Sequence, residues 1–167
     1  MYALRQEAGC FMKRCMIVLL LITALTLAGC SAAPKFIEIK GVEFRTALTV
    51  LRVTFQDLRS SNIEPLEYMK SLAELDLGGN QIKDMGDLKG LRNLKVLGLG
   101  GNRIGDISVL KDLKKLTWLD LSNNQISDIR ALSGLINLWK LDLIGNPLSK
   151  AQINELKTPP PRCLICF

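Results

Sequence analysis

The chain has 167 residues, of which 48% are apolar and 23% charged, a composition typical of a globular protein with one core. Its net charge is +6, but the basic residues are spread along the sequence. Without a basic cluster interleaved with aromatic residues, we expect no nucleic-acid partner. Histidine is absent, which removes the commonest general base and the commonest zinc ligand. We therefore expect no metal and no cofactor.

An uncharged apolar run occupies residues 16–27, shortly after Lys13 and Arg14. Its 12 residues are fewer than the about 20 that cross a bilayer, and they fall within the roughly 7–15 of a signal-peptide core. The run ends in Leu27-Ala28-Gly29-Cys30. This segment resembles the lipobox of bacterial lipoproteins, in which a diacylglyceride is attached to the cysteine thiol and the peptide is cut just before it. The alternative is a buried cysteine at the end of an apolar helix.

The sequence thus predicts a signal peptide over residues 1–29, with a start at Met12 as an alternative, and a lipidated tether over residues 30–40. Cys30 would be the membrane anchor, since two or three acyl chains hold a protein on a membrane almost permanently. In a host with two membranes, the resemblance implies the outer membrane, on its periplasmic or surface face. In other hosts it implies the outer face of the cytoplasmic membrane.

Residues 72–149 form a repeat with a period of 22 residues. Four copies begin at Leu72, Leu94, Leu116 and Leu138. The first three share the frame LxxLxLxxNxI, followed by xD, an apolar residue, xxL and xxL, and the fourth keeps it as far as its asparagine. The frame resembles the leucine-rich repeat family, specifically the 22-residue bacterial type of internalins. The resemblance implies an α/β fold, a right-handed solenoid in the form of a short arc with a parallel β-sheet on its concave face.

The residue types of the repeat agree with that resemblance. In each LxL the two leucines alternate with outward residues, as a strand with one buried face requires. An asparagine three residues later can pair with backbone groups that the turn leaves unbonded. We expect an internal structural ladder of Asn80, Asn102, Asn124 and Asn146. Asp84, Asp106 and Asp128 are expected to accept hydrogen bonds from nearby backbone N–H groups.

A stack of repeats needs a cover at each end. In residues 41–71 we expect an N-terminal helical cap, with Val42, Phe44, Leu48 and Leu51 near one face, and a degenerate first repeat over residues 50–71. That repeat would keep the apolar spacing through Val50, Val53, Phe55, Ile63, Leu66 and Met69. In the C-terminal cap, residues 150–167, Ile153 and Leu156 have helical spacing and "CLICF" resembles a last edge strand.

Cys163 and Cys166 form a CxxC pair near the C-terminus. The mature chain has no second pair and no histidine to complete a zinc site. In an extended segment, residues three apart point to opposite faces, which opposes a direct disulfide. Packing is therefore the favoured role for both, with a disulfide in an oxidising compartment as the alternative.

Folding accounts for the buried positions, so function is expected on the outward positions of the strands. Trp118 is the most informative of these, because an indole on an exposed row has no core to fill and Trp is enriched at binding hot spots. Lys140 is expected to lie over Trp118, and Trp139 to turn toward the edge. The candidate protein-binding residues are Glu74, Asp76, Val96, Trp118, Asp120, Trp139, Lys140, Asp142 and Ile144.

Three functions fit this surface. The first is a monomeric, membrane-anchored, non-catalytic module that binds a protein partner, since an extended repeat surface without a deep cleft suits protein ligands. The second is an envelope spacer without a specific ligand. The third is a carboxylate enzyme acting on glycans through Asp120 and Asp142, whose strands would lie about 4.8 Å apart. The sequence supplies no pocket to raise one carboxyl pKa, so we expect no enzyme.

Overall fold

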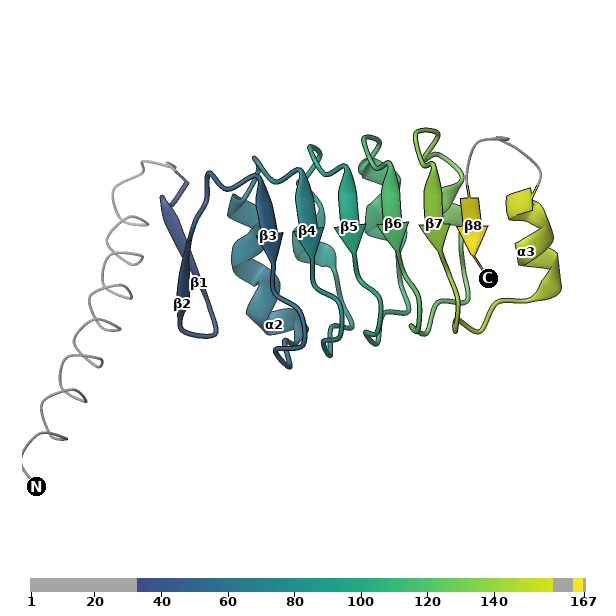
Figure 1. Ribbon diagram of the computed structural model, residues 1–167, viewed down its shortest axis with the longest axis horizontal. Helices are drawn as coiled ribbons and strands as arrows, with labels where there is room; N and C mark the ends of the chain where they lie inside the picture. The colour runs from purple at the N-terminus through teal and green to yellow at the C-terminus, as the bar shows by residue number, and fades with distance from the viewer. Residues whose placement is uncertain (1–32, 158–163, 167) are drawn as a thin grey trace, which may run out of the picture. The chain divides into compact units, whose positions relative to one another are not determined.

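The computed structural model describes residues 33–157 and 164–166 (Figure 1). The predicted signal peptide, Cys30 and Cys163 lie outside the described residues. The chain divides into two compact units, residues 1–33 and 34–167, and the second contains every element described below.

A six-stranded sheet runs through this unit in the order β3-β4-β5-β6-β7-β8, with every neighbouring pair parallel. Its strands are β3 (Val50–Arg52), β4 (Glu74–Asp76), β5 (Val96–Gly98), β6 (Trp118–Asp120), β7 (Lys140–Asp142) and β8 (Leu164–Cys166). Figure 1 shows them side by side in one layer, with short helical turns behind them. One strand with its return segment is a rung, and the stacked rungs confirm the predicted α/β leucine-rich repeat solenoid.

The return segments are the 19–21 residues between one strand of this sheet and the next, and their helical turns are short. They contain the 3-10 helices η1 (Glu64–Tyr68), η2 (Gly86–Leu88), η3 (Ser108–Asp112) and η4 (Arg130–Leu132), and the α-helix α2 (Ser60–Ile63). Each LxL motif places two leucines in the core, and no leucine of the four motifs is more than 2% exposed. The core is therefore one continuous aliphatic column between the sheet and the helical turns.

A ladder of asparagine side chains ties each rung to the one before it. Asn102 is buried, and its Oδ1 accepts the Ile82 N–H of the preceding rung at 3.0 Å. Its Nδ2 donates to the carbonyls of Leu77 and Leu99, each at 3.0 Å. Asn124 and Asn146 repeat this pattern one and two rungs later. One side chain thus satisfies three backbone groups that the turn leaves without strand partners.

The aspartates that begin the return segments close local turns. Asp84, Asp106 and Asp128 each accept the backbone N–H two residues later, at 2.8, 2.8 and 3.0 Å. Each bond lies at the start of a 3-10 helix, where N–H groups have no intrahelical partner. The aspartates therefore fix the direction in which the chain returns.

The predicted N-terminal helical cap is wrong. Strands β1 (Phe36–Ile39) and β2 (Val42–Arg45) form an antiparallel hairpin instead. Its two-residue turn has positive φ at Lys40 (48°) and Gly41 (81°), as a type I′ turn requires. The alternation in "FIEI" buries Ile37 and Ile39, so the hairpin covers the first rung with a two-residue period rather than a helical one.

The same hairpin shortens the predicted tether. The predicted tether covers residues 30–40, but β1 already begins at Phe36, and Ile37 and Ile39 belong to the core. The apolar alternation just before Gly41 was the signal for this strand.

The predicted register of the first rung is wrong in its first half. Leu51, not Val53, pairs with Leu75, so the offset between the first two strands is 24 residues. Phe55 consequently falls at the tight-turn position that Gly79 fills one rung later, with φ at 53°, and it is 79% exposed. The two extra residues are absorbed between Leu58 and Ile63, where α2 forms. From Ile63 onward, Leu66 and Met69 are buried as predicted.

At the other end, the predicted helix and edge strand are confirmed. Helix α3 (Lys150–Lys157) begins with a capping box, in which Ser149 Oγ accepts the Gln152 N–H at 3.3 Å and Gln152 Oε1 accepts the Ser149 N–H at 2.9 Å. Strand β8 pairs in parallel with β7. Cys166 lies in β8, half-buried and with a free thiol.

Candidate binding surface on the sheet

The outward side chains of the six strands form two rows that cross the sheet. The strand register aligns one row of Val50, Glu74, Val96, Trp118, Lys140 and Leu164, and a second row of Arg52, Asp76, Gly98, Asp120, Asp142 and Cys166. We call these two rows, together with Ile144, the sheet face. The structure brings together seven of the nine predicted site residues in the rows themselves, and Ile144, two residues after β7, is 46% exposed.

Trp118 lies in the middle of the first row. The Lys140 ammonium lies over its ring at 5.8 Å from the centroid, a cation–π contact that covers one side of the indole. The side chain is half-buried, and the neighbour on its other side is the smaller Val96. The indole is therefore held in place but remains available from solvent.

The second row is acidic, and each of its aspartates has a structural bond. Asp76, Asp120 and Asp142 accept the backbone N–H groups of Gly78, Ser122 and Ile144 at 3.0, 2.9 and 3.0 Å. These bonds close the turn that follows each strand. The carboxylates thus remain on the sheet face, but one oxygen of each is already engaged.

Glycines on β5 and just after it lie beneath two of these carboxylates. A Cβ on Gly98 would stand 2.7 Å from Asp76 Oδ1, and a Cβ on Gly100 would stand 2.8 Å from Asp120 Oδ2. Both approaches are below van der Waals contact, so a larger residue at either position would displace the carboxylate that lies over the glycine. The carboxylates of Asp76 and Asp120 thus lie over these glycines, on the part of the sheet face near Trp118.

Sequence reasoning missed both ends of the sheet face. Val50 was predicted only as part of the apolar spacing of the first repeat, and Arg52 had no predicted role. Both extend the rows on β3, where Arg52 pairs with Glu74 at 3.4 Å. Leu164 extends the first row on β8 and is 61% exposed. Trp139 stands just before β7, outside the rows, and is 55% exposed.

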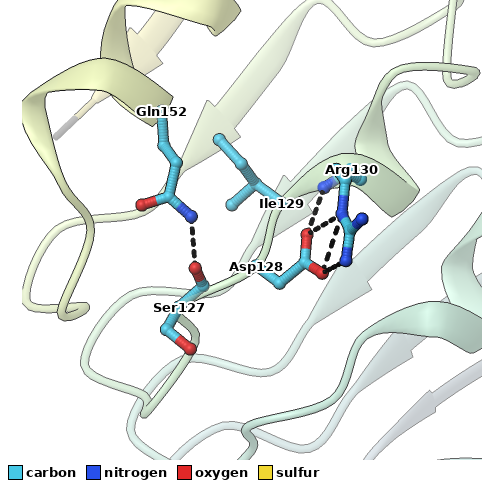
Figure 2. A pocket seen from close by; sticks show the side chains of 5 residues that line it. All are labelled: Ser127, Asp128, Ile129, Arg130 and Gln152. Atoms are coloured by element: carbon cyan, nitrogen blue, oxygen red, sulfur yellow. Dashed lines mark hydrogen bonds and ion pairs between the residues drawn. The ribbon is translucent and has the colours of Figure 1, made fainter.

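The hollow between the last return segment and α3 is a structural junction (Figure 2). It has a volume of about 340 Å³ and is lined by Ser127, Asp128, Ile129, Arg130 and Gln152. The Arg130 guanidinium lies 2.5–3.0 Å from the Asp128 carboxylate and holds its pKa at about 2. Gln152 Nε2 donates to the Ser127 carbonyl, which ties α3 to the rung.

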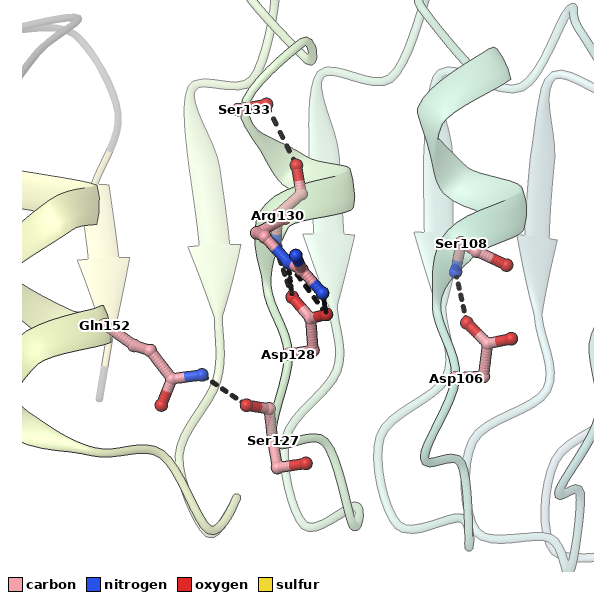
Figure 3. A network of polar contacts seen from close by, with 7 residues as sticks. All are labelled: Asp106, Ser108, Ser127, Asp128, Arg130, Ser133 and Gln152. Atoms are coloured by element: carbon pink, nitrogen blue, oxygen red, sulfur yellow. Dashed lines mark hydrogen bonds and ion pairs between the residues drawn. The ribbon is translucent and has the colours of Figure 1, made fainter.

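This junction extends the turn pattern of the earlier rungs. Figure 3 shows the bond of Asp106 to the Ser108 N–H and, one rung later, the bond of Asp128 to Arg130. The polar groups that line the hollow are thus paired with one another. A second hollow of about 340 Å³ lies between the hairpin and residues 52–56. The candidate site is the sheet face rather than either hollow.

Within residues 33–157 and 164–166, no group of three or more histidine, cysteine or acidic side chains is arranged to hold a metal ion. In the same part of the chain, no helix combines the length and the apolar character that spanning a bilayer requires.

Family models of leucine-rich repeats match the chain twice, over residues 70–112 and residues 106–148. No curated protein matches it significantly. Among solved structures, an internalin, InlF of Listeria monocytogenes, is 42% identical over 53% of this chain and 26% of its own, with a TM-score of 0.53. Internalin C2 of the same species is 35% identical over 61% of this chain and 44% of its own, with a TM-score of 0.55.

The ectodomain of the receptor kinase SOBIR1 from Arabidopsis thaliana is 25% identical over 76% of this chain and 72% of its own, with a TM-score of 0.58. The chain spans less than half the length of either internalin. The two repeat models together cover residues 70–148, the segment that carries the asparagine ladder and strands β4 to β7. Residues 70–148 are therefore leucine-rich repeats, and the fold is a leucine-rich repeat solenoid.

Proposed function

We propose that this chain is a lipid-anchored, non-catalytic module that binds a protein partner through the sheet face. Leucine-rich repeat domains generally mediate protein–protein interaction, and their extended surfaces suit protein ligands. The observation that carries the proposal is Trp118: a half-buried indole at the centre of an open sheet, held by Lys140. A preordered aromatic anchor of this kind is typical of binding hot spots.

The surroundings of Trp118 indicate the chemistry of the partner. The carboxylates of Asp76 and Asp120 lie over Gly98 and Gly100. A basic side chain of the partner would find two acceptors there and an aromatic face beside them. We therefore expect a protein that presents lysine or arginine next to an apolar contact for Trp118.

Catalysis by the paired carboxylates is less well supported. Asp120 and Asp142 are register partners on adjacent strands, but each accepts a backbone N–H and both stand on an open face. Such a face does not exclude water from a reacting bond. The envelope-spacer function predicts instead that no substitution on the sheet face changes the binding of a partner protein.

Replacing Trp118 and Asp120 by alanine tests the binding function. Crosslinking on intact cells followed by mass spectrometry should show that the double variant loses a partner that the wild-type chain retains. Lys83→Ala with Gln125→Ala is the control, since both residues are exposed and lie away from the sheet face. Unchanged thermal unfolding with a lost partner supports binding, whereas an unchanged partner profile supports the spacer.

The anchor is proposed from the sequence alone, on the basic pair, the apolar run and the lipobox that ends at Cys30. We expect Cys30→Ala to abolish incorporation of radioactive palmitate and to leave an uncleaved precursor that keeps residues 1–29. Globomycin, which blocks cleavage at a lipobox, should leave a larger precursor in the wild type. A wild type that takes up no label, or a Cys30→Ala protein that takes up as much label as the wild type, would refute the anchor.

A further inference from the structure

Positive charge gathers on one edge of the repeat stack. We define the strand-start edge as the four segments that lead into β4 to β7, residues 68–73, 89–95, 111–117 and 133–139. It contains one acidic residue, Asp112, and seven basic ones: Lys70, Lys89, Arg92, Lys95, Lys111, Lys114 and Lys115. The strand-end edge, residues 77–85, 99–107, 121–129 and 143–149, contains two basic and three acidic residues.

Backbone bonds hold neighbouring segments of the strand-start edge in register. Lys95 N–H donates to the Ala73 carbonyl at 2.8 Å, and Thr117 N–H donates to the Lys95 carbonyl at 2.8 Å. In the next rung, Trp139 N–H donates to the Thr117 carbonyl at 2.9 Å. Residues 22 positions apart in the sequence thus become neighbours on adjacent rungs. Charge that is spread along the chain is concentrated in space by the repeat.

These charges are not neutralised within the described part of the chain. All seven basic side chains are exposed. Among residues 33–157 and 164–166, the ion pairs are Arg52 with Glu74 and Asp128 with Arg130, and neither involves this edge. Lys115 Nζ bonds to a neutral group, Asn93 Oδ1, at 2.7 Å. The edge therefore carries an uncompensated positive field that attracts an anionic surface.

Apolar side chains flank the basic residues on the same edge. Ile136 is 75% exposed, Trp139 is 55% exposed and Tyr68 is 42% exposed. In the last rung, Ile136 replaces the basic residue found at Arg92 and Lys114. Trp and Tyr favour the boundary between lipid and water, and lysines beside them attract anionic headgroups. An exposed isoleucine is suited to lipid, whereas a nucleic-acid backbone offers it no apolar contact.

The described chain also begins at this edge. Thr46 Oγ1 donates to the Pro34 carbonyl at 2.6 Å, and residues 46–49 lead from β2 into the start of β3. The Thr49 carbonyl accepts the Ala73 N–H of the strand-start edge at 2.8 Å. Cys30 precedes Pro34 by four residues, which span at most about 14 Å when extended. A lipid anchor at Cys30 would thus hold this edge close to the membrane.

We propose that the strand-start edge docks onto an anionic lipid bilayer, with its lysines among the headgroups and Trp139 and Ile136 at the interface. This inference rests on the proposed lipid anchor at Cys30 only for the orientation of the strand-start edge toward the membrane. The sheet face remains free for a protein partner, since its rows lie outside the four segments.

The test uses the full chain with Cys30→Ala, so that no acyl chain contributes, and with Trp118→Phe, so that Trp139 is the only tryptophan. Vesicles of phosphatidylcholine with phosphatidylglycerol should shift Trp139 emission to the blue, and high salt should reverse this shift. Vesicles of phosphatidylcholine alone should not cause it. The apolar run at residues 16–27 contains no tryptophan, so its own lipid binding does not produce this signal.

Charge reversal locates the surface. Lys89→Glu with Lys114→Glu should lower the ratio of docked to undocked edge, measured by Trp139 emission, at least about 30-fold, since each basic residue contributes roughly a fivefold factor. The matched control, Lys83→Glu with Arg103→Glu on the strand-end edge, should have little effect, and the thermal unfolding of both variants reports that they fold. Equal losses in the two variants, an unshifted Trp139, or a response to duplex DNA but not to vesicles would overturn the proposal. The assay contains no protein partner and no acyl chain, so its outcome is independent of the Trp118 and Cys30 tests.

Discussion

Asn102→Ala is expected to lower the free energy of unfolding by about 3–5 kcal/mol. The substitution leaves the buried Ile82 N–H without an acceptor, which costs about 1–3 kcal/mol, and removes two bonds of roughly 1 kcal/mol each to the Leu77 and Leu99 carbonyls. Those carbonyls keep one donor each, from Asn80 and Asn124. The loss of unfolding free energy therefore stays below the cost of leaving three backbone groups without a partner. Chemical denaturation measures the difference.

Two further variants separate the ladder from general effects of the substitution. Asn102→Asp retains the acceptor for Ile82 but replaces the donor by a charged oxygen that faces two carbonyls, so it should cost at least as much as Asn102→Ala. Asn93→Ala is the control, because Asn93 is exposed and its amide donates to one carbonyl, that of Lys70. That variant should stay within about 1 kcal/mol of the wild type. A near-native Asn102→Asp would contradict the role of the amide donor.

Leu51→Ala is expected to destabilise the chain by about 2–5 kcal/mol, whereas Phe55→Gly should leave stability within about 1 kcal/mol. Leu51 is 4% exposed and pairs with Leu75 in the spine of the sheet. Phe55 is 79% exposed with positive φ. Glycine relieves that backbone strain, and the greater freedom of the unfolded chain offsets the gain.

This pair of variants tests the register of the first rung. The 22-residue offset predicted from the sequence would bury Phe55 and place Leu51 elsewhere, so it predicts the opposite order of effects. Calorimetry on both variants distinguishes the two registers. A large loss for Phe55→Gly together with a small loss for Leu51→Ala would refute the register of the structure.

The sequence predicted the repeated part of the fold well, because each rung repeats the physical requirements of its neighbour. The alternation in LxL determines which residues are buried, and the conservation of spacing between copies determines which outward residues align. The sequence alone places Trp118 and Lys140 in one row, because both stand third in their repeats.

The ends of the stack could not be predicted in the same way. The first rung has two additional residues, and nothing local in the sequence indicates whether they enter before the strand or in the return segment. The spacing of Val42, Phe44, Leu48 and Leu51 suggested a helix, but the period-two alternation of residues 36–39 and the turn at Gly41 determine the hairpin. Burial of Ile37 and Ile39 outweighs a weak helical pattern.

The basic edge required both the period and the structure. Along the chain, Lys70, Arg92 and Lys114 are 22 residues apart and do not form a cluster in the sequence. They become neighbours because the rungs stack in register. A comparison of charges at positions one repeat period apart, instead of along a continuous stretch of sequence, would have identified the strand-start edge.

Hydrogen–deuterium exchange of the backbone amides tests most directly that the asparagine ladder binds the rungs into one cooperative stack. The N–H groups of Ile82, Ile104 and Ile126 donate to ladder oxygens in the next rung. They should exchange only through global unfolding, with equal protection, while the exposed turn amides of Gly86 and Ser108 exchange far faster. Ladder amides that exchange as fast as these turn amides, or with unrelated rates from rung to rung, would contradict the account.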